Sequence, residues 1–120
     1  MPPAQIFAGR HILLVEDDFV IALDQAASLA EAGARVVGPA PTLAAALKLV
    51  AEAERLDGAI LDVNLRGELS YPVADALRAR SVPFVFLTGY DRSTISASYP
   101  NVPVCEKPFN LTRIAEVMFG

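Results

Sequence analysis

Along the chain, five short apolar runs alternate with segments in which apolar residues recur at helical spacing. The runs are apolar at nearly every position, with Arg35 in the second as an exception, so both faces of each would be buried, as in a parallel sheet covered by helices. The strands expected on this basis are residues 11–15, 34–38, 58–61, 84–87 and 102–105. Strands alternating with helices in this way predict an α/β fold with a parallel sheet.

The number of units narrows this fold class further. A closed barrel of eight β/α units would need about twice this chain. Five units instead predict a doubly wound (βα)5 flavodoxin-like sandwich, with a five-stranded parallel sheet of order 2-1-3-4-5.

Capping residues and helical spacing place the expected helices. Asp18 can cap a helix over residues 19–32, in which Val20, Leu23, Ala27 and Ala30 recur at helical spacing and Gly33 supplies the stop. Thr42 and Asn110 can cap two further helices, and Pro72 can open another. The apolar faces expected on these helices are Leu43, Ala46, Leu47 and Val50; Val73, Ala76 and Leu77; and Leu111, Ile114, Ala115 and Met118.

The chain has 120 residues and is 53% hydrophobic, which is enough for one core but not for two. We expect a lead over residues 1–10 and a single domain over residues 11–119. Met1 and a helix expected to run to Phe119 would fit a complete small protein, and excision from a longer protein stays open as the alternative.

Several classes of protein are excluded by composition. Cys105 is the only cysteine and His11 the only histidine, so disulfide scaffolds and zinc fingers are not possible. A net charge of -4 without a cluster of basic residues argues against binding to nucleic acid, because the phosphate backbone would be repelled. No apolar stretch approaches the ~20 residues of a membrane span, and we expect a cytoplasmic protein.

Polar residues follow four of the five expected strands. The first ends in Glu16-Asp17-Asp18, the third in Asp62, the fourth in Thr88 and the fifth in Lys107. The second ends in Gly38-Pro39, as expected for an edge strand. In an open α/β sheet, ligands bind beyond the carboxyl ends of the strands, so these side chains are expected to share one pocket.

Three carboxylates in one pocket repel one another unless a cation or a proton intervenes. An all-oxygen donor set favours Mg²⁺. Asp62 could then attack a phosphoryl group, with Lys107 neutralising its charge and Thr88 hydrogen-bonding its oxygen. Each residue alone also has an ordinary structural explanation, and only their joint occurrence at converging strand ends indicates a site.

Four motifs occur along the chain: Val15-Glu16-Asp17, Leu61-Asp62-Val63-Asn64, Leu87-Thr88-Gly89 and Glu106-Lys107-Pro108-Phe109. They stand in the order of the receiver domains of two-component response regulators, which the chain resembles over about residues 11–119. More narrowly, the segment from Pro83 to Tyr90 is similar to the signature of the FAT GUY group, mostly stand-alone receivers of alphaproteobacteria. The loop after Asp62 and the sequence Pro72-Val73-Ala74 also resemble that group.

The resemblance implies a role for each site residue. Asp62 would accept a phosphoryl group from a histidine of a kinase or a phosphotransfer protein. Asp17 would bind Mg²⁺ directly, Glu16 mostly through water, and Asn64 through its backbone carbonyl. Thr88 and Lys107 would contact the phosphoryl group and Gly89 would leave room for it, whereas Asp18 would only cap its helix.

Further expectations concern the Lys107–Pro108 bond and the transmission of the signal. The resemblance implies that this bond is cis. Most receivers carry an aromatic residue where this chain has Val104, so the usual output relay is in doubt. We therefore expect phosphorylation to order a lightly anchored helix over residues 89–100. The common Met-Pro after the phosphoacceptor is replaced by Leu65-Arg66-Gly67-Glu68, so the loop geometry is expected to differ.

The leading interpretation is a single-domain response regulator that catalyses only its own phosphorylation and dephosphorylation and signals by protein contact. A small Mg²⁺-dependent aspartyl-phosphate phosphatase is the main alternative, although it would need a second Asp two residues after its nucleophile and a cap over the substrate. A flavodoxin-like carrier would need a Ser/Thr/Gly-rich phosphate loop where Glu16-Asp17-Asp18 stands. A degenerate scaffold would not need Asp17, Asp62, Thr88 and Lys107 together.

Overall fold

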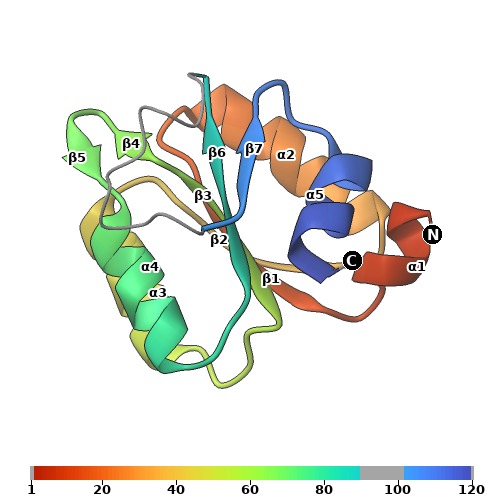
Figure 1. Cartoon of the computed structure of the whole chain (residues 1–120), viewed down its shortest axis with the longest axis horizontal. Coiled ribbons are helices and arrows are strands. Elements are labelled where there is room, and N and C mark those ends of the chain that lie inside the picture. The colour runs from red at the N-terminus through yellow and green to blue at the C-terminus, as the bar shows by residue number, and fades with distance from the viewer. Residues whose placement is uncertain (1, 90–101, 120) are drawn as a thin grey trace.

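A computed structural model of the chain describes residues 2–89 and 102–119. Its centre is a five-stranded sheet of order β2-β1-β3-β6-β7, in which every neighbouring pair is parallel (Figure 1). The strands are β1 (His11–Val15), β2 (Arg35–Ala40), β3 (Gly58–Asp62), β6 (Phe84–Thr88) and β7 (Val104–Glu106). This is the expected doubly wound fold with the expected spatial order of strands.

Helices cover both faces of this sheet (Figure 1). The core on one face is completed by α3 and α4, and the core on the other by α1, α2 and α5. Their bounds are α1 (Pro3–Phe7), α2 (Phe19–Glu31), α3 (Leu43–Glu52), α4 (Tyr71–Ala79) and α5 (Leu111–Phe119). Among the described helices none combines the length and the apolar character that a membrane span requires.

The two central strands are buried along their whole length, which explains their uninterrupted apolar sequences. Every residue of β3 and β6 is buried, so each strand gives alternate side chains to the two cores. The edge strand β2 is half-buried and continues through Pro39 to Ala40, rather than ending at Gly38 as the sequence suggested. Proline is tolerated there because an edge strand has one side without ladder hydrogen bonds.

The three predicted N-caps are present. Asp18 Oδ1 accepts a hydrogen bond from the Ile21 N–H at 3.0 Å, and Thr42 Oγ1 accepts one from the Ala45 N–H at 3.1 Å. Asn110 Oδ1 accepts the Arg113 N–H at 3.1 Å. The apolar faces predicted for α3, α4 and α5 also lie in or against the core.

Helix α2 lies where it was expected, but the apolar stripe that predicted it faces outward. Its buried residues are Ala22, Gln25 and Leu29. Val20 and Leu23 are 67% and 51% exposed, and Phe19 at the start of the helix is 75% exposed. Both faces of α2 are thus rich in apolar residues, and periodicity alone could not tell which one packs on the sheet.

The loop after β3 contains a two-stranded antiparallel hairpin that the sequence did not predict (Figure 1). It consists of β4 (Asn64–Leu65) and β5 (Glu68–Leu69). Arg66 and Gly67 at its tip have φ values of +53° and +93°, and Asn64 Oδ1 accepts a hydrogen bond from the Gly67 N–H at 2.6 Å. This short turn holds the Arg66 backbone in a fixed place above the end of β3.

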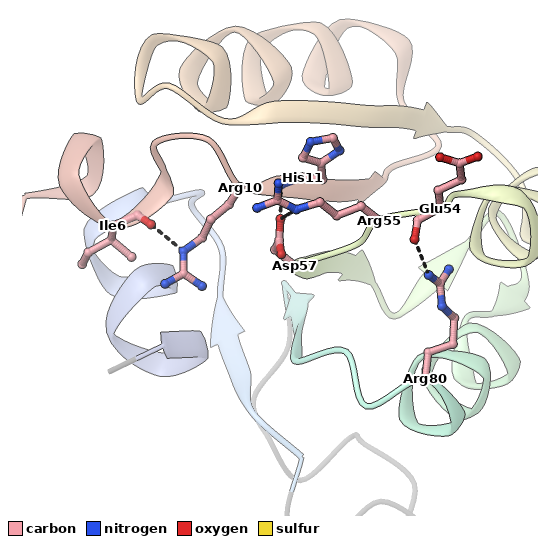
Figure 2. Close-up of polar contacts among 7 residues, drawn as sticks. All are labelled: Ile6, Arg10, His11, Glu54, Arg55, Asp57 and Arg80. Carbon is pink, nitrogen blue, oxygen red and sulfur yellow. Dashed lines mark hydrogen bonds and ion pairs between the residues drawn. The ribbon is translucent and has the colours of Figure 1, made fainter.

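The expected lead over residues 1–10 contains α1, which packs against α5. Phe7 is fully buried and meets the Phe119 ring edge to face, with 5.8 Å between the ring centroids. The Arg10 guanidinium lies 3.9 Å from the Phe119 ring centroid, and Arg10 Nε donates a hydrogen bond to the Ile6 carbonyl at 2.7 Å (Figure 2). The lead therefore contributes to the core.

Polar contacts also tie the elements together where the strands begin (Figure 2). Asp57 accepts hydrogen bonds from the His11 N–H at 2.7 Å and from Arg55 Nε at 2.9 Å. Arg80 at the end of α4 donates to two carbonyls near the end of α3, those of Val50 and Glu54. These contacts lie at the amino ends of the strands, whereas the polar residues of the predicted site lie at the carboxyl ends.

Apart from Gly89, the helix expected over residues 89–100 lies outside the described residues.

Candidate functional site

The carboxyl ends of β1, β3, β6 and β7 converge on one pocket of about 680 Å³. This edge of the sheet points upward in Figure 1, with the β4–β5 hairpin beside it at the upper left. The described residues that line the pocket are Asp17, Asp62, Val63, Asn64, Arg66, Leu69, Leu87, Thr88, Gly89 and Lys107. The structure thus brings the ends of these four strands together at one pocket, whereas the roles of the predicted site residues stay predictions.

Asp17 and Asp62 line this pocket, and Glu16, which is not one of the lining residues, completes a cluster of three carboxyl groups. One oxygen each of Glu16, Asp17 and Asp62 lies within 4.8 Å of the other two. Asp62 is the last residue of β3, and Glu16 follows β1 directly, where its N–H donates a hydrogen bond to the Ala40 carbonyl at 3.1 Å. The strand pairing thus brings together acids that are distant in the sequence.

Lys107, the residue after β7, faces the acids from two strands away, because β6 lies between β3 and β7 in the sheet. Its Nζ lies 3.1 Å from Asp62 Oδ1 and 3.3 Å from Oδ2. Its backbone N–H donates to the Thr88 carbonyl at 2.8 Å, which fixes the base of the side chain, and the Lys107–Pro108 bond is cis as expected. Burial works against the charged ammonium, but attraction by Asp62, and then by Glu16 and Asp17, leaves the pKa of Lys107 raised. Lys107 is therefore a cation at this site at neutral pH.

Glu16 is the most deeply buried of the three acids, with 2% of its surface exposed. Burial raises the pKa of Glu16 to about 8, the hydrogen bond and the charge of the adjacent Asp62 carboxyl add to the rise, and Lys107 opposes it. Without another cation, burial and the neighbouring Asp62 carboxyl therefore favour the protonated form of Glu16.

The donor set fits a hard divalent cation. Glu16 Oε2 is buried, and no N–H or O–H of the described residues donates a hydrogen bond to it. A buried carboxylate oxygen without a donor is costly, and a cation would satisfy it. Carboxylate oxygens alone, without imidazole or thiolate, are the ligands that Mg²⁺ prefers. The residues that would hold such an ion are Glu16, Asp17 and Asp62.

The remaining predicted residues occupy different parts of the site. Thr88 is 5% exposed and lines the pocket at the end of β6. Asn64 lines it from β4, with its side-chain oxygen bound to the Gly67 N–H, and its ligation through the backbone carbonyl stays a prediction. Asp18 is absent from the pocket lining and caps α2, as expected.

Two residues near the site were not predicted. Ser70 is fully buried, its Oγ donates a hydrogen bond to the Asp62 carbonyl at 2.5 Å, and its N–H donates to the Val63 carbonyl at 2.9 Å. Arg66 lies at the hairpin tip, with Nε 3.4 Å from Asp17 Oδ2. A serine ahead of a helix and an arginine in a polar loop carry no distinctive sequence signal, because both contacts depend on the hairpin.

Val104 occupies the position at which most receiver domains carry an aromatic residue. It pairs in register with Phe86 and packs, half-buried, against the core of the α3 and α4 face. The Tyr71 ring meets Phe86 edge to face at 5.6 Å. Among the described residues, aromatic packing on this face is thus supplied by α4 and β6 rather than by β7.

Comparison with known proteins connects this site to one class of signalling protein. No family model matches the chain. The Phyllosphere-induced regulator PhyR of Methylorubrum extorquens is 30% identical over 113 residues, which are 92% of this chain and 42% of PhyR, so the chain spans less than half the length of this relative.

Solved structures match over a larger share of their own length. SdrG from Sphingomonas melonis Fr1 is 40% identical, with a TM-score of 0.77 over 98% of this chain and 95% of SdrG. A structure described as the BeF3-activated conformation of SdrG is 41% identical, with a TM-score of 0.74 over 91% of this chain and 92% of that one. A response regulator receiver protein from Sinorhizobium medicae, 23% identical, shares the fold with a TM-score of 0.76 over 91% of this chain and 94% of that one.

Proposed function

The chain is a response regulator receiver domain, and we propose that it takes part in a two-component phosphorelay by accepting a phosphoryl group on Asp62. The observation that carries this proposal is the position of the Asp62 carboxylate. One of its oxygens lies within 4.8 Å of an oxygen of each of two further acids, and Oδ1 lies 3.1 Å from the Lys107 ammonium. No other carboxylate of the described site has both an acid cluster and an ion pair with Lys107.

In the proposed reaction, an oxygen of Asp62 attacks the phosphorus atom of a phosphohistidine. A P–O bond forms, the P–N bond breaks, and the imidazole nitrogen leaves with the electron pair and takes a proton from solvent. Lys107 neutralises charge on the transferred group, and the Thr88 hydroxyl, at the pocket wall, donates a hydrogen bond to one of its oxygens. Ser70 holds the Asp62 backbone while the side chain reacts.

A Mg²⁺ ion held by Glu16, Asp17 and Asp62, with the Asn64 carbonyl, would shield the carboxylates and stabilise the charge of the phosphoryl group. The buried, donorless Oε2 of Glu16 supports this assignment.

The proposed partners are a sensor histidine kinase or a histidine phosphotransfer protein upstream, and a protein that is contacted by the phosphorylated form downstream. On this proposal the domain catalyses only its own phosphorylation and the hydrolysis that follows. The narrower assignment to the FAT GUY group and the cytoplasmic localisation stay predictions.

Incubation with acetyl phosphate and Mg²⁺ tests the proposal without a protein partner. Intact-protein mass spectrometry should show the addition of one phosphoryl group to the wild type and none to Asp62→Asn. Asp18→Asn is the matched control, because Asp18 follows the same acidic run but caps α2, and it should be labelled like the wild type. Full labelling of Asp62→Asn would move the acceptor to Asp17 or Asp18 and favour the phosphatase interpretation.

A further inference from the structure

Two cationic side chains are among the described residues that line the pocket, and the proposed function uses only one of them. Lys107 approaches Asp62 from β7. Arg66 approaches from the β4–β5 hairpin, with Nε 3.4 Å from Asp17 Oδ2. The hairpin places Arg66 there through the left-handed φ of its tip and the 2.6 Å hydrogen bond from the Gly67 N–H to Asn64 Oδ1.

We propose that Arg66 is an exchangeable cation of this site, whose guanidinium neutralises Asp17 while no divalent ion is bound and turns to the phosphoryl group on Asp62 once the ion takes Asp17. This inference rests on the proposed function, because it assigns a role to Arg66 in the binding of the same two ligands.

The ion pair of Arg66 and Asp17 suits such an exchange. The Arg66 side chain is 78% exposed and the Asp17 side chain 18% exposed, so water screens the pair and it is weak. A divalent cation carries twice the charge and can bind several of the clustered oxygens at once, so it displaces the guanidinium from Asp17 at modest cost. The same displacement means that Arg66 lowers the affinity of the site for the ion.

The second half of the exchange follows from distance and charge. Oxygens of Asp17 and Asp62 lie within 4.8 Å of each other, so a guanidinium that pairs with Asp17 needs only a side-chain rotation to reach a group on Asp62. A phosphoryl group brings about two negative charges. The contact with Asp17 uses Nε, which leaves the paired Nη donors for the bidentate geometry that arginine forms with phosphate. Lys107, which already pairs with Asp62, contributes a single ammonium.

Two titrations test this exchange. The first follows amide NMR shifts of residues 16–18 and 62–64 as Mg²⁺ alone is added, and the second follows beryllofluoride binding in saturating Mg²⁺ as a mimic of the phosphoryl group. Arg66→Ala should bind Mg²⁺ about two- to fivefold more tightly and beryllofluoride about two- to fivefold more weakly than the wild type. Arg66→Lys should bind Mg²⁺ almost as weakly as the wild type, because the positive charge is kept. Its affinity for beryllofluoride should lie between those of the wild type and Arg66→Ala, because lysine lacks the paired donors.

Arg35→Ala is the matched control, because Arg35 is an exposed arginine at the start of β2, at the opposite edge of the sheet. It removes the same charge without removing the contact between Arg66 and Asp17. The affinities for Mg²⁺ and for beryllofluoride should both equal those of the wild type within experimental error. Equal affinities in Arg66→Ala and Arg35→Ala would overturn the exchange, and so would a change of both affinities in the same direction. A wild type that binds neither ligand would instead overturn the proposed function itself.

Discussion

Glu16 makes the stability of the empty domain depend on pH in an unusual direction. Its pKa is raised from 4.5 to about 8 by burial and by Asp62, so between these values the folded state holds a proton that the unfolded state has lost. The contribution of Glu16 is therefore fully present below pH 4.5 and is lost as the pH rises toward 8. The expected slope in the free energy of unfolding is at most about -1.4 kcal/mol per pH unit.

Denaturant unfolding between pH 4.5 and 8 in the presence of a chelator measures this slope. Glu16→Gln should flatten it, because glutamine does not titrate, and Glu106→Gln, an exposed acid at the end of β7, should leave it as in the wild type. A wild-type stability that rises steadily across this range would show that Glu16 is ionised in the folded domain.

The side chains of the site could be predicted from the sequence, whereas their fine positions could not. Four of these residues, Asp17, Asp62, Thr88 and Lys107, lie at or just after the carboxyl ends of strands. The carboxyl ends of parallel strands meet at one edge whatever the details of packing. Arg66 and Ser70 reach the site only because residues 64–69 form a hairpin, which depends on backbone angles at the tip that a polar loop sequence does not specify.

Helix α2 carries an exposed apolar stripe, Val20 and Leu23, that belongs to neither core. Val20 and Leu23 are more than half exposed, and α2 begins directly after the acidic run. Apolar patches of this kind commonly mark contact surfaces. Replacing both residues by glutamate should change the free energy of unfolding by less than about 0.5 kcal/mol and slow phosphotransfer from a histidine-containing protein at least tenfold.

Phosphorylation by acetyl phosphate separates docking from chemistry in this double variant, and its rate should be unchanged. Leu29→Ala, on the buried face of the same helix, is the contrasting control and should cost about 2–5 kcal/mol of stability. Normal transfer from the protein donor to the double variant would show that the partner contacts a different surface.

Helical spacing located α2, but the stripe that located it is not the one that packs on the sheet, and the reason lies in the composition of the helix. Thirteen residues contain two apolar stripes, one of Ala22 and Leu29 that packs on the sheet and one of Val20 and Leu23 that faces outward. The buried stripe also includes Gln25, a polar residue that masks it in the sequence. The faces of α3, α4 and α5 were predicted correctly because each has a single apolar stripe.

The two edges of the sheet divide the molecule into a reactive end and a stabilising end. The acids and Lys107 gather where the strands finish, whereas Asp57, Arg80 and the packing of α1 on α5 lie away from the described pocket. Phe7→Ala should therefore lower the free energy of unfolding by about 3–5 kcal/mol, since it empties a fully buried position.

The Mg²⁺ affinity of folded Phe7→Ala should stay within twofold of the wild type, as judged by the same NMR titration. Ile6→Ala, half-buried on the same helix, should give a smaller loss of stability. A large loss of Mg²⁺ affinity in folded Phe7→Ala would show that the two ends are coupled through the core.

The parallel sheet order has a consequence for how the chain reaches this state. The strand β1 pairs with β3, so that Ile12 meets Gly58, and β3 in turn pairs with β6, so that Ala59 meets Phe84. Each pairing closes a long loop before it contributes any contact, so parallel pairing is slower to form than the local contacts of a helical bundle. During synthesis on a ribosome, Asp17 therefore emerges long before Lys107, and the reactive pocket does not exist until almost the entire domain has left the exit tunnel.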